Sequence, residues 1–125
     1  MNLKNVKYII LDMDGCCYHP RYLKTLFGQV SSRMTDFISL KLGIEKKKAK
    51  EIQREYFYKY DTSLNGLMKN YPDLIDGEEF LKYVHDINYD CLEKDIDLRE
   101  EMLKLDVKIY CATNGSKEHA ISCMK

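Results

Sequence analysis

The feature that most constrains the fold is a short apolar run that ends in carboxylates. Residues 8–11 read Tyr-Ile-Ile-Leu, Asp12 follows directly, and Asp14 comes after one intervening residue. Consecutive apolar and β-branched residues predict a parallel strand that is covered on both faces. Asp12 is then expected at the carboxyl end of this strand, which is the edge where open α/β sheets bind ligands.

Two acids at the end of a buried strand indicate a bound cation, because an ionised carboxylate is costly to desolvate without a partner or a metal. In extended geometry Asp12 and Asp14 leave the same face, and Gly15 allows a sharp turn around a ligand. Mg²⁺ with a phosphate suits such a loop, since Mg²⁺ takes oxygen ligands and keeps water and phosphate in its shell. The alternative is a plain turn in which an Asp caps the next segment.

A second strand-to-turn junction lies near the end of the sequence. Residues 107–112 are mainly apolar, and Thr113, Asn114 and Gly115 follow them. If the two strands are parallel neighbours, Thr113 lies at the same sheet edge as Asp12, and the backbone amides of the turn suit an oxyanion. Thr113 and Asn114 also suit a helix N-cap, and the two roles are compatible.

Between the two strands, apolar residues recur at helical spacing. Helices are predicted up to Leu42 before Gly43, over about 46–60, and after the acidic pairs Asp76/Glu79 and Asp97/Glu100. Residues 62–71 are expected to form a short helix or an irregular turn. The predicted fold class is α/β, with a partial Rossmann-like parallel sheet and an inserted helical cap. The sheet core is expected in residues 1–18 and 106–125, and the cap in residues 19–105.

Charge and cysteine content exclude several classes of protein. The 20 basic and 20 acidic residues cancel, which gives no electrostatic reason to expect nucleic acid or an anionic membrane as a partner. The N-terminus lacks the layout of a secretory signal, and no run approaches the ~20 apolar residues of a membrane span. We expect an intracellular protein, cytoplasmic with a nuclear location also compatible. The 5 cysteines have no Cys-x-x-Cys pair and no zinc-ligand spacing to the histidines, which indicates reduced thiols.

The run Asp-Met-Asp-Gly-Cys-Cys-Tyr after a strand resembles the first motif of the haloacid-dehalogenase-like phosphohydrolases. The resemblance implies that Asp12 attacks phosphorus and forms an aspartyl-phosphate. It implies that Asp14 is general acid and then base, and that Mg²⁺ is bound through Asp12 and Asp14, the latter by its backbone carbonyl. Thr113 is similar to the family's second motif, whose hydroxyl binds the transferring phosphoryl group, and Asn114 adds a phosphate-side contact.

The inserted helices, together with the segments Thr113–Gly115 and His119-Ala120, resemble the pyrimidine 5′-nucleotidase branch over nearly the whole chain. The resemblance implies hydrolysis of a small-molecule phosphate ester, a nucleoside 5′-monophosphate. Asp61 stands where this branch leads us to expect glycine, and Cys16 and Cys17 replace Thr/Val and Leu/Val of the first motif. A cysteine phosphatase would need Cys-x5-Arg, and Cys16 to Arg21 is one residue short.

Other chemistry-bearing residues have simpler interpretations. His85 and His119 are taken as surface or packing residues, because phosphoryl transfer through an aspartate needs no histidine nucleophile. The aromatic series of residues 56–60 is interpreted as core, with nucleobase stacking as the alternative.

The family's third motif, a Lys or Arg, and its fourth, the acids that complete the Mg²⁺ site, have no counterpart after Thr113. Lys117 is too close to Thr113 to take the third role. We therefore expect the 125-residue chain to be a fragment, catalytically inert, with a helical cap and a loose or aggregation-prone sheet. The alternative function is a truncated relative that acts only as a binding or interaction module.

Overall fold

The computed structural model describes residues 4–124 and divides into two compact units. The first unit combines both parts of the chain, up to Thr25 and from Tyr89 onward, and the second is Leu26–Asn88. The predicted division of the chain into a sheet core and a helical cap, with boundaries at residues 18 and 106, stays a prediction. Residues 1–3 and 125, which were assigned to the sheet core, lie outside the described residues. Within residues 4–124, no helix has the length and apolar character needed to cross a membrane.

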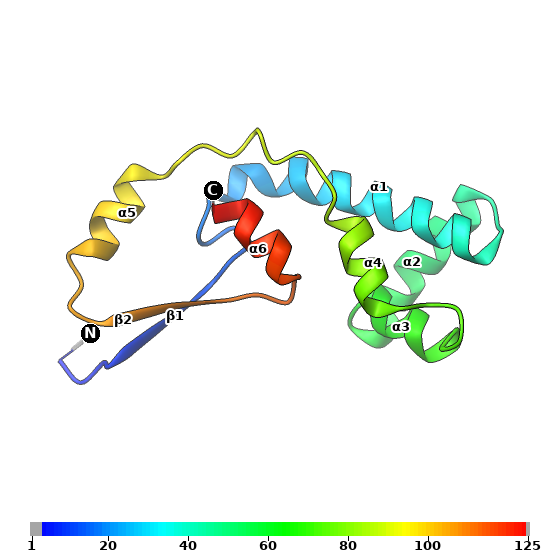
Figure 1. Ribbon diagram of the computed structural model, residues 1–125, viewed down its shortest axis with the longest axis horizontal. Coiled ribbons are helices and arrows are strands. Elements are labelled where there is room, and N and C mark those ends of the chain that lie inside the picture. Colours follow the sequence, from blue (N-terminus) through cyan, green and yellow to red (C-terminus); the bar gives the residue numbers. More distant parts are fainter. Residues whose placement is uncertain (1–3, 125) are drawn as a thin grey trace. The chain divides into compact units, whose positions relative to one another are not determined.

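The first unit contains a parallel pair of strands, β1 (Tyr8–Asp12) and β2 (Lys108–Ala112), which lie side by side in Figure 1. Their register runs from Tyr8 opposite Lys108 to Asp12 opposite Ala112. The predicted parallel pairing is confirmed. The described residues form a mixed α/β structure with a small sheet, and a full Rossmann fold is not present in them.

The prediction that β1 is buried on both faces is wrong for this chain. Tyr8 is 59% exposed and Ile10 is 71% exposed, while Ile9 and Leu11 are half-buried. Tyr110 lies opposite Ile10 on β2 and is 52% exposed. Among the described residues, no element covers this face of the strand pair, so its apolar side chains meet solvent.

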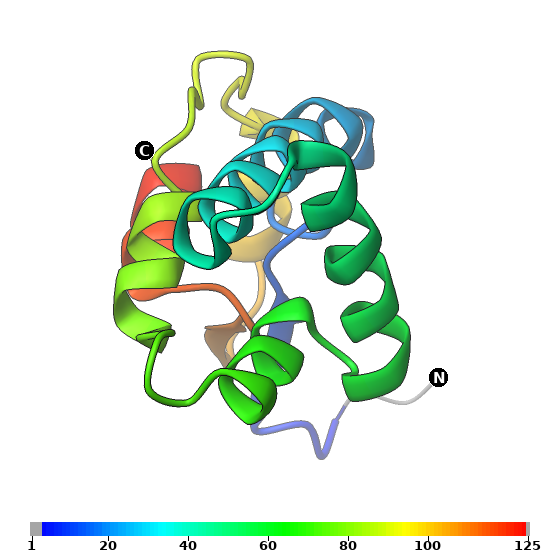
Figure 2. The same ribbon diagram turned by 90° about the vertical axis from the view of Figure 1, so that its right-hand side faces the viewer.

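The second unit is helical and has its own apolar core, and its helices face the viewer in Figure 2. It comprises most of α1 (Leu23–Leu42), then α2 (Lys46–Tyr60), α3 (Ser63–Asn70) and α4 (Gly77–Val84). The core consists of Val30, Phe37, Ile38, Ala49, Tyr56, Leu67, Ile75, Phe80 and Val84. Apart from Ile75, which lies in the turn between α3 and α4, these are apolar positions at helical spacing, so the predicted helices and their buried faces are confirmed.

Residues in the left-handed region end the first two helices. Gly43 follows α1 with φ 62° and is the predicted helix terminator. Asp61 follows α2 with φ 67°, the region that glycine adopts without strain, which explains why a glycine was expected there. At α4 the predicted cap is confirmed, since the carboxylate of Asp76 accepts hydrogen bonds from the Glu78 and Glu79 amides.

Three further elements belong to the first unit: a 3-10 turn, η1 (Pro20–Tyr22), and the helices α5 (Ile96–Leu103) and α6 (Lys117–Met124). The cap predicted at Asp97 is wrong. Asp95 caps α5 instead, because its carboxylate accepts a hydrogen bond from the Leu98 amide at 2.9 Å. Asp97 lies in the first helical turn, where an acid still favours the positive end of the helix dipole.

Candidate functional site at the strand ends

The two strand ends meet at one edge of the sheet. Asp12 lies opposite Ala112, and the Met13 amide donates to the Ala112 carbonyl at 3.1 Å, so pairing continues to the last residue of each strand. Thr113 follows Ala112 directly. Asp12 and Thr113 therefore share the carboxyl edge, as the two strand-to-turn junctions predicted.

The backbone turns sharply after Asp12. The Cys16 and Cys17 amides both donate to the Met13 carbonyl, at 3.2 and 3.0 Å. Gly15 adopts φ 73°, and a Cβ there would lie 2.9 Å from Leu23 Cδ1. The predicted turn at Gly15 is confirmed, and its positive φ is the backbone conformation that favours glycine.

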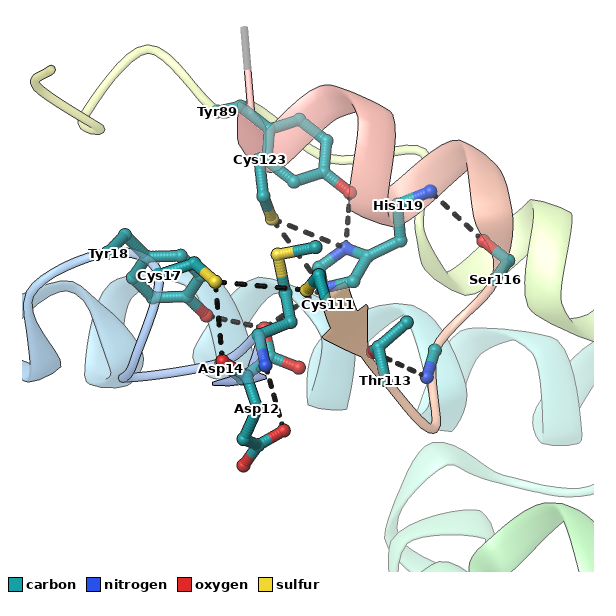
Figure 3. A network of polar contacts seen from close by, with 12 residues as sticks. Asp12, Asp14, Cys17, Tyr18, Tyr89, Cys111, Thr113, Ser116, His119 and Cys123 are labelled. Carbon is teal, nitrogen blue, oxygen red and sulfur yellow. Dashed lines mark hydrogen bonds and ion pairs between the residues drawn. The ribbon is translucent and has the colours of Figure 1, made fainter. Parts of the chain in front are cut away.

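This turn separates the two predicted acids. Asp12 Oδ1 accepts from the Met13 amide at 2.9 Å, and in Figure 3 its carboxylate points away from the cluster formed around Asp14. The expectation that both side chains leave one face assumed an extended chain, whereas the chain bends at Met13. Asp12 is exposed and Asp14 is half-buried, so the two carboxylates have different surroundings.

Asp14 lies in a polar cluster with Tyr18, His119 and Tyr89. The Tyr18 hydroxyl donates to Asp14 Oδ1 at 2.6 Å, and His119 Nε2 lies 3.1 Å from the same oxygen. The Tyr89 hydroxyl contacts His119 Nδ1 at 2.7 Å. His119 is only 3% exposed and Tyr18 only 4%. Burial, and then the hydrogen bond to Asp14, raise the pKa of Tyr18, so its hydroxyl stays a donor.

The turn after β2 corrects the predicted helix cap. Thr113 Oγ1 accepts from the Gly115 amide at 3.0 Å, which closes a local turn. Ser116 caps α6, because its hydroxyl accepts from the His119 amide at 3.1 Å. Asn114 is exposed in the same turn. Thr113 and Asn114 therefore remain candidates for phosphate contacts without serving as the cap.

Several cysteines lie close to these acids. Cys17 Sγ is 3.7 Å from Cys111 Sγ and also contacts the Asp12 carbonyl. Burial, and then the hydrogen bond with Cys111, raise the pKa of Cys17 to about 12. Cys123 Sγ lies 3.7 Å from His119 Nε2, and burial followed by the charge of Asp14 raises its pKa to about 12. These thiols therefore carry protons at neutral pH.

Sequence reasoning took His119 for a surface or packing residue and did not anticipate its contact with Asp14. It is buried, but its ring also contacts the second acid of the first motif. Its position gave a usable signal, because His119 lies in the first turn of the helix that follows β2, at the edge where Asp14 was expected. His85 has a different environment, since it ends α4 in the helical unit.

A hollow of about 360 Å³ lies elsewhere in the first unit. Its walls come from η1 and from the segment that enters α5, including Arg21 and Asp95. Neither Asp12 nor Thr113 lines it. That Asp12 and Thr113 open onto one cleft therefore stays a prediction. The structure shows that they lie at the same edge of the sheet.

The fold and the site together define a mixed α/β protein whose polar cluster lies at the carboxyl ends of two parallel strands. No family model matches the chain. It is 28% identical over 128 residues to Phosphate metabolism protein 8 of Saccharomyces cerevisiae (strain ATCC 204508 / S288c). That alignment covers 95% of this chain and 39% of the yeast protein, so the chain spans well under half the length of this relative.

Proposed function

We propose that the first unit carries the acidic part of a phosphate-monoester hydrolase site, with a nucleoside 5′-monophosphate as substrate. Asp12 is the nucleophile, and its carboxylate oxygen forms a bond to phosphorus as the bond to the leaving oxygen breaks. Asp14 gives that oxygen a proton. Water then attacks phosphorus, Asp14 takes a proton from it, and the acyl-phosphate bond breaks to release phosphate and restore Asp12.

The observation that carries this proposal is the different environment of two neighbouring acids. Asp12 is exposed at the sheet edge and accepts one short hydrogen bond, from the Met13 amide. Asp14 is half-buried and is contacted by a tyrosine and a histidine. An accessible carboxylate suits attack, whereas a held carboxylate suits proton transfer, and environments of this kind divide two acids into two roles.

The donor chemistry at the turn fits Mg²⁺. Asp12 offers carboxylate oxygens, and Asp14 offers its backbone carbonyl while its side chain faces His119. When bound, Mg²⁺ would neutralise charge that develops on the phosphoryl group. Thr113 and Asn114, on the adjoining strand end, supply hydroxyl and amide donors for phosphate oxygens. The Gly115 amide donates a hydrogen bond to Thr113 Oγ1, which orients the Thr113 hydroxyl.

The yeast relative supports the broad class through its name, which refers to phosphate metabolism. The choice of a nucleotide substrate has narrower support, namely the resemblance of the helical segments to the pyrimidine 5′-nucleotidases. We assign the helical unit, Leu26–Asn88, the role of the cap that selects the leaving group.

Hydrolysis assays test the proposal directly. Release of inorganic phosphate is measured with Mg²⁺ and either pyrimidine or purine nucleoside monophosphates, with p-nitrophenyl phosphate as a general substrate. In a version that also carries the family's third and fourth motifs, Asp12→Asn should abolish the Mg²⁺-dependent rate, and Cys16→Ser, the matched control in the same turn, should keep it. A rate that survives in Asp12→Asn and disappears in Cys16→Ser would reject the aspartyl-phosphate mechanism.

The alternative is a protein that binds through its helical unit without turnover. It is favoured by the independent apolar core of that unit and by two exposed aromatic residues on α2, Phe57 and Tyr58. The same assay separates the two functions. Absence of phosphate release from the version that carries those motifs, at any Mg²⁺ concentration, rejects the hydrolase and favours the binding module.

A further inference from the structure

Three side chains that suit a metal ion converge on one point of the first unit. Asp14, His119 and Cys123 each offer one ligand atom, and these atoms all lie within 4.8 Å of one another. His119 and Cys123 are four residues apart on α6, which places them on the same face of the helix. Asp14 comes from the turn after β1. The expectation of no zinc-ligand spacing overlooked the pair of His119 and Cys123, and the third ligand is distant along the chain.

Two of the three separations are close to those of a tetrahedral site, and all three ligand atoms lie within 4.8 Å of one another. With bonds of about 2.0 Å to oxygen and nitrogen and about 2.3 Å to sulfur, ligand atoms lie roughly 3.3–3.7 Å apart. Here His119 Nε2 lies 3.1 Å from Asp14 Oδ1 and 3.7 Å from Cys123 Sγ. Binding an ion would therefore require shifts of these side chains, of which His119 and Cys123 already lie next to each other, as Figure 3 shows.

The groups behind these ligands also suit a metal. Metal-bound histidines usually engage their second ring nitrogen in a hydrogen bond, which fixes the tautomer. His119 has such a partner, because the Tyr89 hydroxyl lies 2.7 Å from Nδ1 and leaves Nε2 directed at Asp14. Tyr18 orients the carboxylate of Asp14 in the same way, at 2.6 Å.

We propose that Asp14, His119 and Cys123 bind a borderline transition-metal ion of the Zn²⁺ class. Imidazole and thiolate ligands select such ions over Mg²⁺, which takes oxygen ligands, and binding releases the proton that Cys123 carries in the metal-free protein. The fourth position is open to water. This site goes beyond the proposed hydrolysis, and where that proposal holds, the ion inhibits the reaction because it occupies the Asp14 carboxylate needed for proton transfer.

Cobalt(II) is the probe, since a tetrahedral cobalt-thiolate site absorbs visible light and shows a near-ultraviolet charge-transfer band. Titration of the reduced protein with Co²⁺ should give this spectrum at one ion per chain, and added Zn²⁺ should remove it. Cys123→Ser should lose the charge-transfer band, and His119→Gln should weaken binding. Tyr89→Phe, which keeps all three ligands, should lower affinity about 10–100-fold.

The matched controls are Cys16→Ser and Asp12→Asn, which should keep the cobalt spectrum, and excess Mg²⁺, which should not displace Co²⁺. If the cobalt spectrum is retained in Asp12→Asn, the metal site does not depend on the proposed nucleophile. The metal site and the hydrolysis proposal can then fail independently of each other. A wild-type protein without the spectrum would overturn the metal site. So would a charge-transfer band that persists in Cys123→Ser, a conservative change in a half-buried residue.

Discussion

His119 Nε2 and Asp14 Oδ1 lie 3.1 Å apart although 105 residues separate them along the chain. This contact joins the turn after β1 to the helix after β2 within the first unit. It therefore fixes the position of the half-buried acid, while Asp12, two residues away, stays exposed. The candidate chemistry of the site depends on this difference between the two acids.

The hydrogen bond from Tyr18 to Asp14 should contribute measurably to stability. Tyr18→Phe removes a buried hydroxyl that donates to a carboxylate at 2.6 Å, so the free energy of unfolding should fall by about 1.5–3 kcal/mol. Tyr22→Phe is the matched control, because its hydroxyl accepts from Arg21 at the surface, and a change within about 0.5 kcal/mol is expected. Urea unfolding measures both. Equal losses of unfolding free energy in Tyr18→Phe and Tyr22→Phe would mean that the hydrogen bond to Asp14 contributes no more than a surface hydrogen bond.

Two helical glycines should respond to alanine with opposite signs. At Gly66 an added Cβ would lie 2.5 Å from Tyr56 Cβ, so α3 cannot stay this close to α2, and Gly66→Ala should destabilise by about 1–3 kcal/mol. At Gly28 nothing lies within 4 Å, so Gly28→Ala should stabilise α1 by roughly 0.5–1 kcal/mol. Thermal unfolding followed by circular dichroism tests the pair, and a stabilising Gly66→Ala would contradict the packing described.

The helical unit should lose stability in alkali through Tyr56. Burial, and then the hydrogen bond with Tyr71, raise the pKa of Tyr56 from 10.0 to about 12. The unfolded chain therefore ionises first, and stability that is intact below pH 10.0 is lost as pH rises toward about 12. Tyr56→Phe should make this decline shallower, and Tyr58→Phe, at a residue 78% exposed, should leave it unchanged. Parallel curves for all three proteins would reject Tyr56 as the cause.

Backbone amides should exchange hydrogen at different rates in the two units. The helices of Leu26–Asn88 enclose a buried core, whereas β1 and β2 form a sheet of two strands with Ile10 71% exposed. Two strands give marginal stability, so their amides should exchange faster than those of α1 and α2. Hydrogen exchange with mass spectrometry measures this. Strong protection of both strands would refute the loose sheet expected from the sequence.

Local patterns were sufficient to predict most of the elements. The apolar residues of α2 recur at helical spacing within one short segment, and Asp76 caps amides only two and three residues away. Both signals can therefore be identified from the local sequence alone. The parallel pairing of β1 with β2 also followed, because both strands end in polar turns. The predicted cap at Asp97 failed because α5 begins at Ile96, two residues earlier than expected, where Asp95 accepts from the Leu98 amide.

What could not be predicted depends on distant neighbours. Strand burial is decided by what packs on each face, and nothing in residues 8–11 reveals that Ile10 faces solvent. The contact between His119 and Asp14 depends on where α6 starts relative to the first turn. The turn at Met13 likewise directs Asp12 and Asp14 apart, which an extended-chain argument cannot anticipate.

The central claim is that Asp12 is the phosphoryl acceptor, and beryllofluoride binding tests it without requiring turnover. Beryllofluoride forms a stable mimic of an aspartyl-phosphate in the presence of Mg²⁺ and is followed by fluorine NMR. The account predicts a protein-bound signal that requires Mg²⁺, disappears in Asp12→Asn and persists in Cys17→Ser. A bound signal that survives in Asp12→Asn, or no bound signal in the unmodified protein, would contradict it.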